Sequence, residues 1–503
     1  MIVTGSTDGV QLWEFSGRTL CERARLSDTY CGFSSQLLPS GQLLFTFANT
    51  PKSLVFRTIA SALHPEDVIE ETSVEFDVLI DAFEVVGGGR LALIRLERQE
   101  ENVVLYHIKA RKVLHTLRSG AIVMNSHTVL WPYTVSDDGK YISYQDGAII
   151  HVYELLEDQT LELLGYTGAV VKGESVRNVT CHFTPTLKIS SDQLPEHCLL
   201  ICMPSKSKGG AGYAMLYKLT QLIKCENPTL ENVAVPPYMY QKLQACDRYE
   251  ACFGESGTWL LLRCKSEVDT SEKGHYYGTS TLYFFNLNAR IIECIGGKDQ
   301  YVHAFSIKPT LKAISPTDTL IEEQFIVIFG TPPPKAQEYV VRSRLGRHGH
   351  VTDLTLNSTL GSLAVNSISW EPAGRFALLR GEVGMNGESK LVRLAIGGEP
   401  TCIASTTIYS KTCASISPSG DIVMYGVTRP RFNVDNGIEL FDLQLKPLTH
   451  KAFTGLFYCG FLPFTEKDYA VKPLCDVPSG QSLKDVKKAT GGKYVPPSQR
   501  GKK

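Results

Sequence analysis

Short strands in which apolar and polar residues tend to alternate recur along this chain, each preceded by a turn of glycine or polar residues. Their spacing is roughly 40 to 70 residues, and self-similarity at such a period indicates a repeat architecture. Because the repeating unit consists of strands, the pattern predicts an all-β, WD-repeat-like β-propeller. The nine strands are Val10–Phe15, Ser53–Ile59, Asn102–Ile108, Ala148–Leu155, Ala214–Leu219, Thr281–Leu287, Glu338–Arg344, Lys390–Ile396 and Ile438–Leu443.

A second and more continuously apolar strand precedes most of these nine strands. Leu43–Phe47 follows the turn Pro39–Gly41, and Ile422–Tyr425 follows the turn Ser417–Gly420. Polar residues with proline and glycine favour the tight turns that join antiparallel strands. A nearly continuous apolar run is typical of a strand that is covered on both faces. We therefore expect each repeat to form one blade of antiparallel strands.

The first and last repeats are incomplete in a complementary way. The N-terminus supplies Ile2–Thr4 and Val10–Phe15, and Gly455–Leu462 is an apolar strand without a hairpin partner. Pairing these strands in one shared blade would close the ring and remove two open sheet edges. The sequence thus predicts one nine-bladed propeller over residues 1–464. Eight blades stay possible, because the repeats between residues 156 and 320 are weak.

The composition changes after about Thr465. Residues 484–503 contain seven basic residues and one acidic residue, with frequent glycine, serine and proline and no apolar period. This composition predicts that residues 465–503 form a flexible basic tail. Adjacent prolines favour a polyproline II conformation that can dock in a partner's groove. The candidate docking residues are Lys493, Tyr494, Pro496, Pro497 and Arg500, unless the tail serves only solubility.

Composition and charge exclude few classes of function. The formal net charge is −1, which argues neither for nor against a nucleic-acid partner. No apolar run approaches the roughly 18 residues that span a bilayer, and the start of the chain does not resemble a signal peptide. We therefore expect a soluble, cytoplasmic and monomeric protein without a membrane partner.

We find no motif that carries catalysis. The sequence contains no nucleophile elbow, phosphate-binding loop, zinc-protease helix motif or dinucleotide fingerprint. Its 14 cysteines include no C-x-x-C pair, so we interpret them as small buried residues in a reducing compartment rather than metal ligands. No catalytic residue, metal or cofactor is therefore assigned. A hydrolase or lyase propeller is an alternative class with no residues to support it.

Two arginine-rich loops are candidates for RNA contact. One contains Arg342, Arg344 and Arg347, and the other contains Arg429 and Arg431. Arginines on a rigid loop neutralise phosphates and fix the register of a nucleic acid. The alternative is a solvated loop between strands, and the turn signal Asn-Gly explains the end of the second loop without any ligand.

Several segments resemble the eukaryotic translation initiation factor 2A family. They occur in the same order as in that family and are concentrated in the C-terminal half of the chain. The matching segments are Pro430–Gly437 followed by Ile438–Asp442, Val268-Asp269 with Tyr276–Gly278 and Thr281–Tyr283, the positions Gly330, Pro333, Lys335 and Ala336, the opening Gly5-Ser6 with Asp8-Gly9, and Tyr494, Pro496, Pro497 and Arg500.

The resemblance implies a nine-bladed propeller with a basic extension. It also implies binding to the small (40S) ribosomal subunit, through rRNA and ribosomal proteins, and a role with initiator methionyl-tRNA and mRNA. Asn433 stands where the family has an arginine, and we keep it as a candidate contact. The family's long lysine-rich extension does not follow Arg500 here. If tRNA binding in the family resides largely in that extension, we expect this chain to keep the ribosome-facing platform and to lose tRNA delivery. Alternatives are the related propeller found in initiation factor three and a general protein scaffold.

Overall fold

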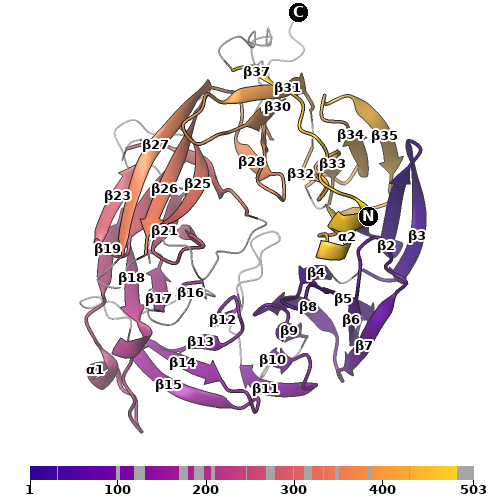
Figure 1. The fold of residues 1–503 in the computed structure, drawn as a ribbon. Helices are drawn as coiled ribbons and strands as arrows, with labels where there is room; N and C mark the ends of the chain where they lie inside the picture. Colours follow the sequence, from indigo (N-terminus) through magenta and orange to yellow (C-terminus); the bar gives the residue numbers. More distant parts are fainter. Residues whose placement is uncertain are drawn as a thin grey trace, which may run out of the picture.

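Nine β-sheets form a closed ring in the computed structural model (Figure 1). The prediction of a single nine-bladed propeller is therefore confirmed. The structure describes residues 1–30, 32–97, 102–117, 131–168, 179–185, 197–205, 210–244, 246–267, 278–297, 300–310, 320–331, 333–345, 350–382, 387–409, 411–429 and 431–483.

Each blade is an antiparallel sheet whose strands run in order from the centre of the ring to its rim. Blades 1 to 3 consist of β36 (Leu456–Phe461), β1 (Ile2–Ser6), β2 (Gly9–Ser16) and β3 (Thr19–Ser27); β4 (Phe33–Leu37), β5 (Leu43–Thr50), β6 (Ser53–Ile59) and β7 (Val68–Glu75); and β8 (Ile80–Val86), β9 (Leu91–Leu96), β10 (Val103–His107) and β11 (Lys112–Leu117). Blades 4 to 6 consist of β12 (Tyr133–Val135), β13 (Tyr141–Asp146), β14 (Ile149–Leu155) and β15 (Leu161–Gly168); β16 (Thr180–Phe183), β17 (Cys198–Met203), β18 (Gly212–Lys218) and β19 (Met239–Leu243); and β20 (Arg248–Phe253), β21 (Trp259–Ser266), β22 (Thr279–Asn286) and β23 (Ile291–Ile295).

The last three blades follow the same order. They consist of β24 (Val302–Ile307), β25 (Leu320–Phe329), β26 (Lys335–Arg344) and β27 (Val351–Ser362); β28 (Ser367–Trp370), β29 (Ala377–Arg380), β30 (Glu388–Arg393) and β31 (Thr401–Thr407), with β37 (Gln481–Ser482) added at the rim; and β32 (Cys413–Ile416), β33 (Val423–Val427), β34 (Gly437–Phe441) and β35 (Pro447–Ala452). The described helices are short: η2 (Leu219–Gln221), α1 (Leu230–Val233) and α2 (Glu466–Val471).

Burial explains which strands the sequence pattern reveals. The second and third strands of a blade are covered on both faces, and most residues of β5 and β6 are buried. The fourth strand lies at the rim and faces water, so β7 is mostly exposed. The apolar pattern predicts the covered strands and does not reveal the rim strands, whose residues are largely polar.

The core is divided into layers between neighbouring blades. Val3 and Leu12 of blade 1 pack with Phe45 of blade 2, and Trp259 of blade 6 lies 5.7 Å, between ring centroids, from Phe325 of blade 7. Each sheet therefore buries both faces against its neighbours, and a blade cannot bury its apolar residues alone.

The two ends of the chain meet in blade 1, as the sequence predicted. Strand β36 pairs antiparallel with β1, with Ile2 opposite Phe461 and Thr4 opposite Cys459. The N-terminal segment supplies three strands rather than the two predicted, because β3 is a polar rim strand. The fully buried Leu456 packs in one apolar cluster with residues of blades 1 and 9. Ring closure is thus secured by backbone pairing and by this core layer.

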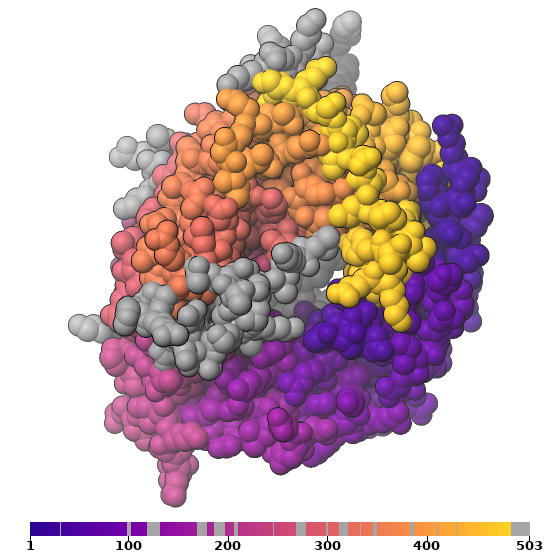
Figure 2. Space-filling model, in the orientation of Figure 1, coloured from indigo at the N-terminus to yellow at the C-terminus, as the bar shows by residue number. Residues whose placement is uncertain are grey.

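Residues 462–483, here called the strap, correct the predicted start of the flexible tail at residue 465. They fold back over one face of the ring (Figures 1 and 2). Helix α2 begins with a capping box between Thr465 and Asp468. The strap ends at β37, which adds a fifth strand to blade 8 by pairing with β31. The predicted tail is thereby reduced to residues 484–503, which lie outside the described residues.

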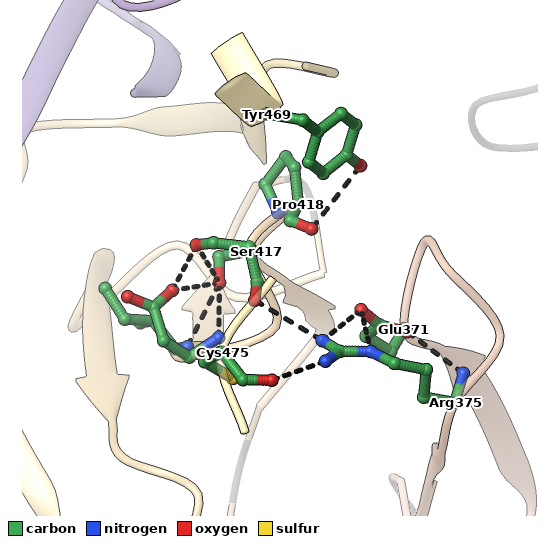
Figure 3. Close-up of polar contacts among 9 residues, drawn as sticks. Glu371, Arg375, Ser417, Pro418, Tyr469 and Cys475 are labelled. Atoms are coloured by element: carbon green, nitrogen blue, oxygen red, sulfur yellow. Dashed lines mark hydrogen bonds and ion pairs between the residues drawn. The ribbon is translucent and has the colours of Figure 1, made fainter. Parts of the chain in front are cut away.

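Polar contacts hold the strap to blades 2, 8 and 9. The carboxylate of Asp468 accepts hydrogen bonds from the Ser61 hydroxyl and from the backbone N–H of Ala62 at 3.0 Å. Arg375 donates to the carbonyl of Cys475 and also pairs with Glu371 (Figure 3). Polar contacts of this kind do not require apolar residues at regular spacing. The composition of the strap alone therefore suggested a flexible segment.

The strap defines the two faces of the propeller. It contacts turns between the first and second strands of blades 8 and 9, and the connection between the third and fourth strands of blade 2. We call this side the strap face. Connections between second and third strands, and between successive blades, lie at the other ends of the strands, on the side that we call the open face.

Replacing Leu456 by alanine should destabilise the ring. The change leaves a cavity at a fully buried position of the closing strand, and such cavities cost about 2–5 kcal/mol. The matched control is Val471→Ala in the strap, where the side chain is 72% exposed and the expected effect is below about 0.5 kcal/mol. Urea unfolding of both variants measures the difference. Equal midpoints would contradict a stabilising role for ring closure.

The strap should loosen in acid. Burial alone would raise the pKa of Asp468, but hydrogen bonds from Ser61, Ala62 and Thr465 together lower it below its ordinary value. The ionised group therefore stabilises the fold above pH of about 4 and stops doing so as the pH falls through its lowered pKa. Asp468→Asn should cost about 1–3 kcal/mol at pH 7. The difference in melting temperature from the wild type should shrink below pH 4, and a constant difference would contradict this account.

Candidate functional site

The loop between β33 and β34 lies on the open face of blade 9 and contains three of the predicted contact residues. We call residues 428–436 the arginine loop; Pro430 lies outside the described residues. Arg431 and Asn433 are exposed, Val434 is 68% exposed, and Arg429 is half-buried. The loop therefore presents one exposed guanidinium beside an amide and an apolar side chain.

Asn436 holds the arginine loop against the segment 453–455 that joins β35 to β36, here called the closing connection. Its side-chain amide donates to the carbonyl of Phe432 at 2.8 Å, and its side-chain oxygen accepts from the backbone N–H of Leu456 at 3.2 Å. Its backbone carbonyl accepts from Phe453 at 2.9 Å. The side chain is 5% exposed, so these hydrogen bonds are shielded from water. The loop is therefore positioned by a rigid element.

Arg429 forms the second link between the loop and the ring closure. Its backbone N–H donates to the carbonyl of Leu456 at 2.7 Å. Its guanidinium lies against Gly455, where an added Cβ would be 3.4 Å from the guanidinium carbon. The buried Nε–H finds no acceptor among the described residues. Arg429 therefore packs at the base of the loop, whereas the side chain of Arg431 is exposed to solvent.

Two more of the predicted arginines, Arg342 and Arg344, lie on the strap face of blade 7. Arg342 and Arg344 are at the end of β26, before the connection to the fourth strand. Arg342 is paired with Glu322 at 2.8 Å, whereas Arg344 is exposed. Arg347 lies outside the described residues. The structure therefore does not bring the two arginine groups together, because they are on opposite faces and on different blades.

The remaining predicted contacts are in the tail. Lys493, Tyr494, Pro496, Pro497 and Arg500 all lie outside the described residues. Their predicted role in docking stays a prediction.

A cavity of about 410 Å³ lies on the strap face between blades 1, 2 and 9 and the strap. The residues that line it include Phe15, Leu63, Phe464 and Lys472.

The described residues contain no group of three histidine, cysteine or acidic side chains arranged to hold a metal ion. In that same part of the chain, no helix has the length and apolar character needed to cross a membrane.

The sequence did not reveal the residues that position the arginine loop. Gly455 and Leu456 follow Asn436 by about 20 residues, and Thr7 of blade 1 donates its backbone N–H to the carbonyl of Gly455 at 3.2 Å. These segments come together only because the ring closes there. The motif Asn436-Gly437 indicated a turn, but its hydrogen bonds to the closing connection have no local signal.

Comparisons with known proteins agree with the resemblance seen in the sequence. Residues 241–459 match the family model of eukaryotic translation initiation factor eIF2A. The chain is 23% identical over 346 residues to eukaryotic translation initiation factor 2A of Saccharomyces cerevisiae, covering 63% of this chain and 48% of that protein. It is 22% identical over 223 residues to the factor of the same name in Schizosaccharomyces pombe, covering 43% and 34%. The chain thus spans about half or less of these relatives.

A solved structure supports the fold. A crystal structure of a eukaryotic initiation factor superposes with a TM-score of 0.62 at 13% identity, covering 92% of this chain and 99% of the other. The family match begins in β19 and ends in β36, so it includes blades 6 to 9, the arginine loop and the closing strand. The family resemblance is therefore confirmed over the part of the ring that carries the candidate site.

Asn436→Ala should detach the arginine loop from the closing strand. The change removes the acceptor for the Leu456 N–H and the donor to Phe432, which we expect to cost about 1–3 kcal/mol. Asn433→Ala in the same loop is the matched control, because that side chain is exposed and the expected change is below about 0.5 kcal/mol. Chemical denaturation compares the two variants. Equal stability would show that the Asn436 hydrogen bonds do not anchor the loop.

Proposed function

We propose that this chain, which matches the family model of eukaryotic translation initiation factor eIF2A over residues 241–459, is a non-enzymatic translation initiation factor that binds the small ribosomal subunit. The observation that carries this proposal is the family match over residues 241–459, which contains the arginine loop. The propeller acts as a rigid platform, and its loops make the contacts.

We assign the ribosome-facing surface to the open face of blade 9. Arg431 is exposed on a loop held by buried hydrogen bonds, so its guanidinium is available for an rRNA phosphate. Asn433 and Val434 lie beside it and contact the same partner. Arg342 is a weaker candidate because Glu322 already neutralises it, and Arg344 lies on the opposite face of the ring.

The finer parts of the proposal concern the tail and its partners. Lys493, Tyr494, Pro496, Pro497 and Arg500 dock on RNA or on a ribosomal protein, and the ring holds the tail near the small ribosomal particle. Initiator tRNA and mRNA are the other RNA partners that the family relation suggests. The factor works as a monomer in the cytoplasm, without a metal or cofactor.

Small-subunit binding should be weakened by salt and by Arg431→Ala. Each phosphate contact releases counterions, so affinity falls as salt rises, and loss of one contact reduces the salt slope by about 1. We expect Arg431→Ala to weaken co-sedimentation with purified small subunits roughly 3–10-fold at low salt, since a contact of this kind is worth about 1 kcal/mol. The matched control, Arg344→Ala on the strap face, should bind like the wild type.

The same assay distinguishes the rival functions. An absence of binding at low salt, or binding that molar salt leaves unchanged, would overturn the proposal. Capture of non-ribosomal complexes that resists ribonuclease would instead favour a protein scaffold. If Arg344→Ala weakens binding and Arg431→Ala does not, the contact surface belongs to the strap face.

A further inference from the structure

Two cysteines far apart in the sequence meet at the junction of blades 9 and 1. The Sγ atoms of Cys413 and Cys459 lie 3.5 Å apart, although 46 residues separate them in the chain. Cys413 begins β32, the innermost strand of blade 9, and Cys459 lies in β36, the innermost strand of blade 1. The contact therefore connects the last complete blade to the strand that closes the ring.

Gly426 provides the space for this sulfur pair. It lies directly opposite Cys413 in the pairing of β32 with β33. A Cβ at Gly426 would be 2.6 Å from the sulfur of Cys413 and 2.6 Å from the sulfur of Cys459. Any side chain at this position would displace both thiols, so the local backbone is suited to hold them together.

The environment makes the two thiols unequal. A hydrogen bond from the Cys459 thiol lowers the pKa of Cys413 to about 7 despite its burial, with Thr412 and Arg380 adding to the shift. The same interaction, with burial, raises the pKa of Cys459. Both residues are partly exposed. The lowered pKa favours the thiolate form, and therefore the nucleophilic role, at Cys413 rather than Cys459.

We propose that Cys413 and Cys459 form a redox modification site in which a peroxide converts the two thiols into a reversible disulfide. The Cys413 thiolate attacks one oxygen of hydrogen peroxide, the O–O bond breaks, and after proton transfer the products are a sulfenic acid and water. The Cys459 thiol then attacks the sulfenic sulfur, which releases a second water and forms the S–S bond. Two sulfurs lose two electrons in total, and the peroxide gains them.

The geometry requires little movement. A disulfide bond is about 2.05 Å long, so the sulfurs have to approach by about 1.5 Å. We expect rotation about the Cα–Cβ bonds of the two side chains to provide this shift.

The bond would reinforce the part of the ring that carries the arginine loop. The hydroxyl of Thr412, next to Cys413, lies 2.8 Å from that of Thr428 at the start of the loop. Arg429 is hydrogen bonded to Leu456, three residues before Cys459. A covalent link at this junction restricts the unfolded chain and opposes separation of the closing strand. Oxidation therefore locks the closure and the base of the loop together.

Treatment of the folded, reduced full-length protein with a small excess of hydrogen peroxide at pH 7 tests the proposal. We expect a mass loss of about 2 Da, from removal of two hydrogens. A cross-linked peptide should contain Cys413 and Cys459, the melting temperature should rise by a few degrees, and dithiothreitol should reverse both changes. The matched control Cys252→Ser removes another partly exposed cysteine, whose pKa burial raises to about 11, and should leave the cross-link intact.

Two single substitutions separate the roles of the thiols. Cys459→Ser should leave Cys413 as a sulfenic acid that dimedone traps, whereas Cys413→Ser should give no trapped adduct at Cys459. A cross-link that maps to other cysteines, or no loss of thiols until the protein unfolds, would overturn the proposal. The readout is independent of ribosome binding, so its failure leaves the proposed function untouched.

Discussion

Pairing of β36 with β1 is the constraint on which the rest of the structure depends. A chain of blades has two open edges, and each inner layer needs a neighbouring sheet to bury its apolar residues. Closing the ring removes both edges and completes the cluster around Leu456. The arginine loop and the cysteine pair lie at this junction, where blades 9 and 1 meet, and the strap begins there.

Buried polar side chains fix how the blades sit against one another. Glu323 of blade 7 accepts hydrogen bonds from Ser256 and Trp259 of blade 6, although burial raises its pKa. Asp468 plays the corresponding part between the strap and blade 2. Apolar layers are tolerant of sliding, whereas a carboxylate needs its donors at defined distances. These buried carboxylates therefore fix the orientation of neighbouring blades, whereas the apolar core supplies most of the stability.

The strands with apolar sequence were predictable, and those without it were not. Ser53–Ile59 and Leu91–Ile94 are covered on both faces, and their composition indicates as much. Rim strands such as β7 expose polar side chains, so neither they nor the strap have a periodic signal. The arginine loop was found as a motif, but its face and its anchor Asn436 depend on contacts between distant segments. Sequence patterns thus predict which strands are buried, but they do not predict which distant segments of the chain come into contact.

The position of β37 determines where the chain leaves the described structure. By pairing with β31, it carries the backbone to the outer edge of blade 8, away from the centre of the ring (Figure 1). A fluorophore or affinity tag placed just after Leu483 would therefore report from the periphery of the disc. Any C-terminal attachment would start from the outer edge of blade 8, the blade that precedes blade 9 and its arginine loop, so the ring limits which neighbouring molecules the attachment can reach.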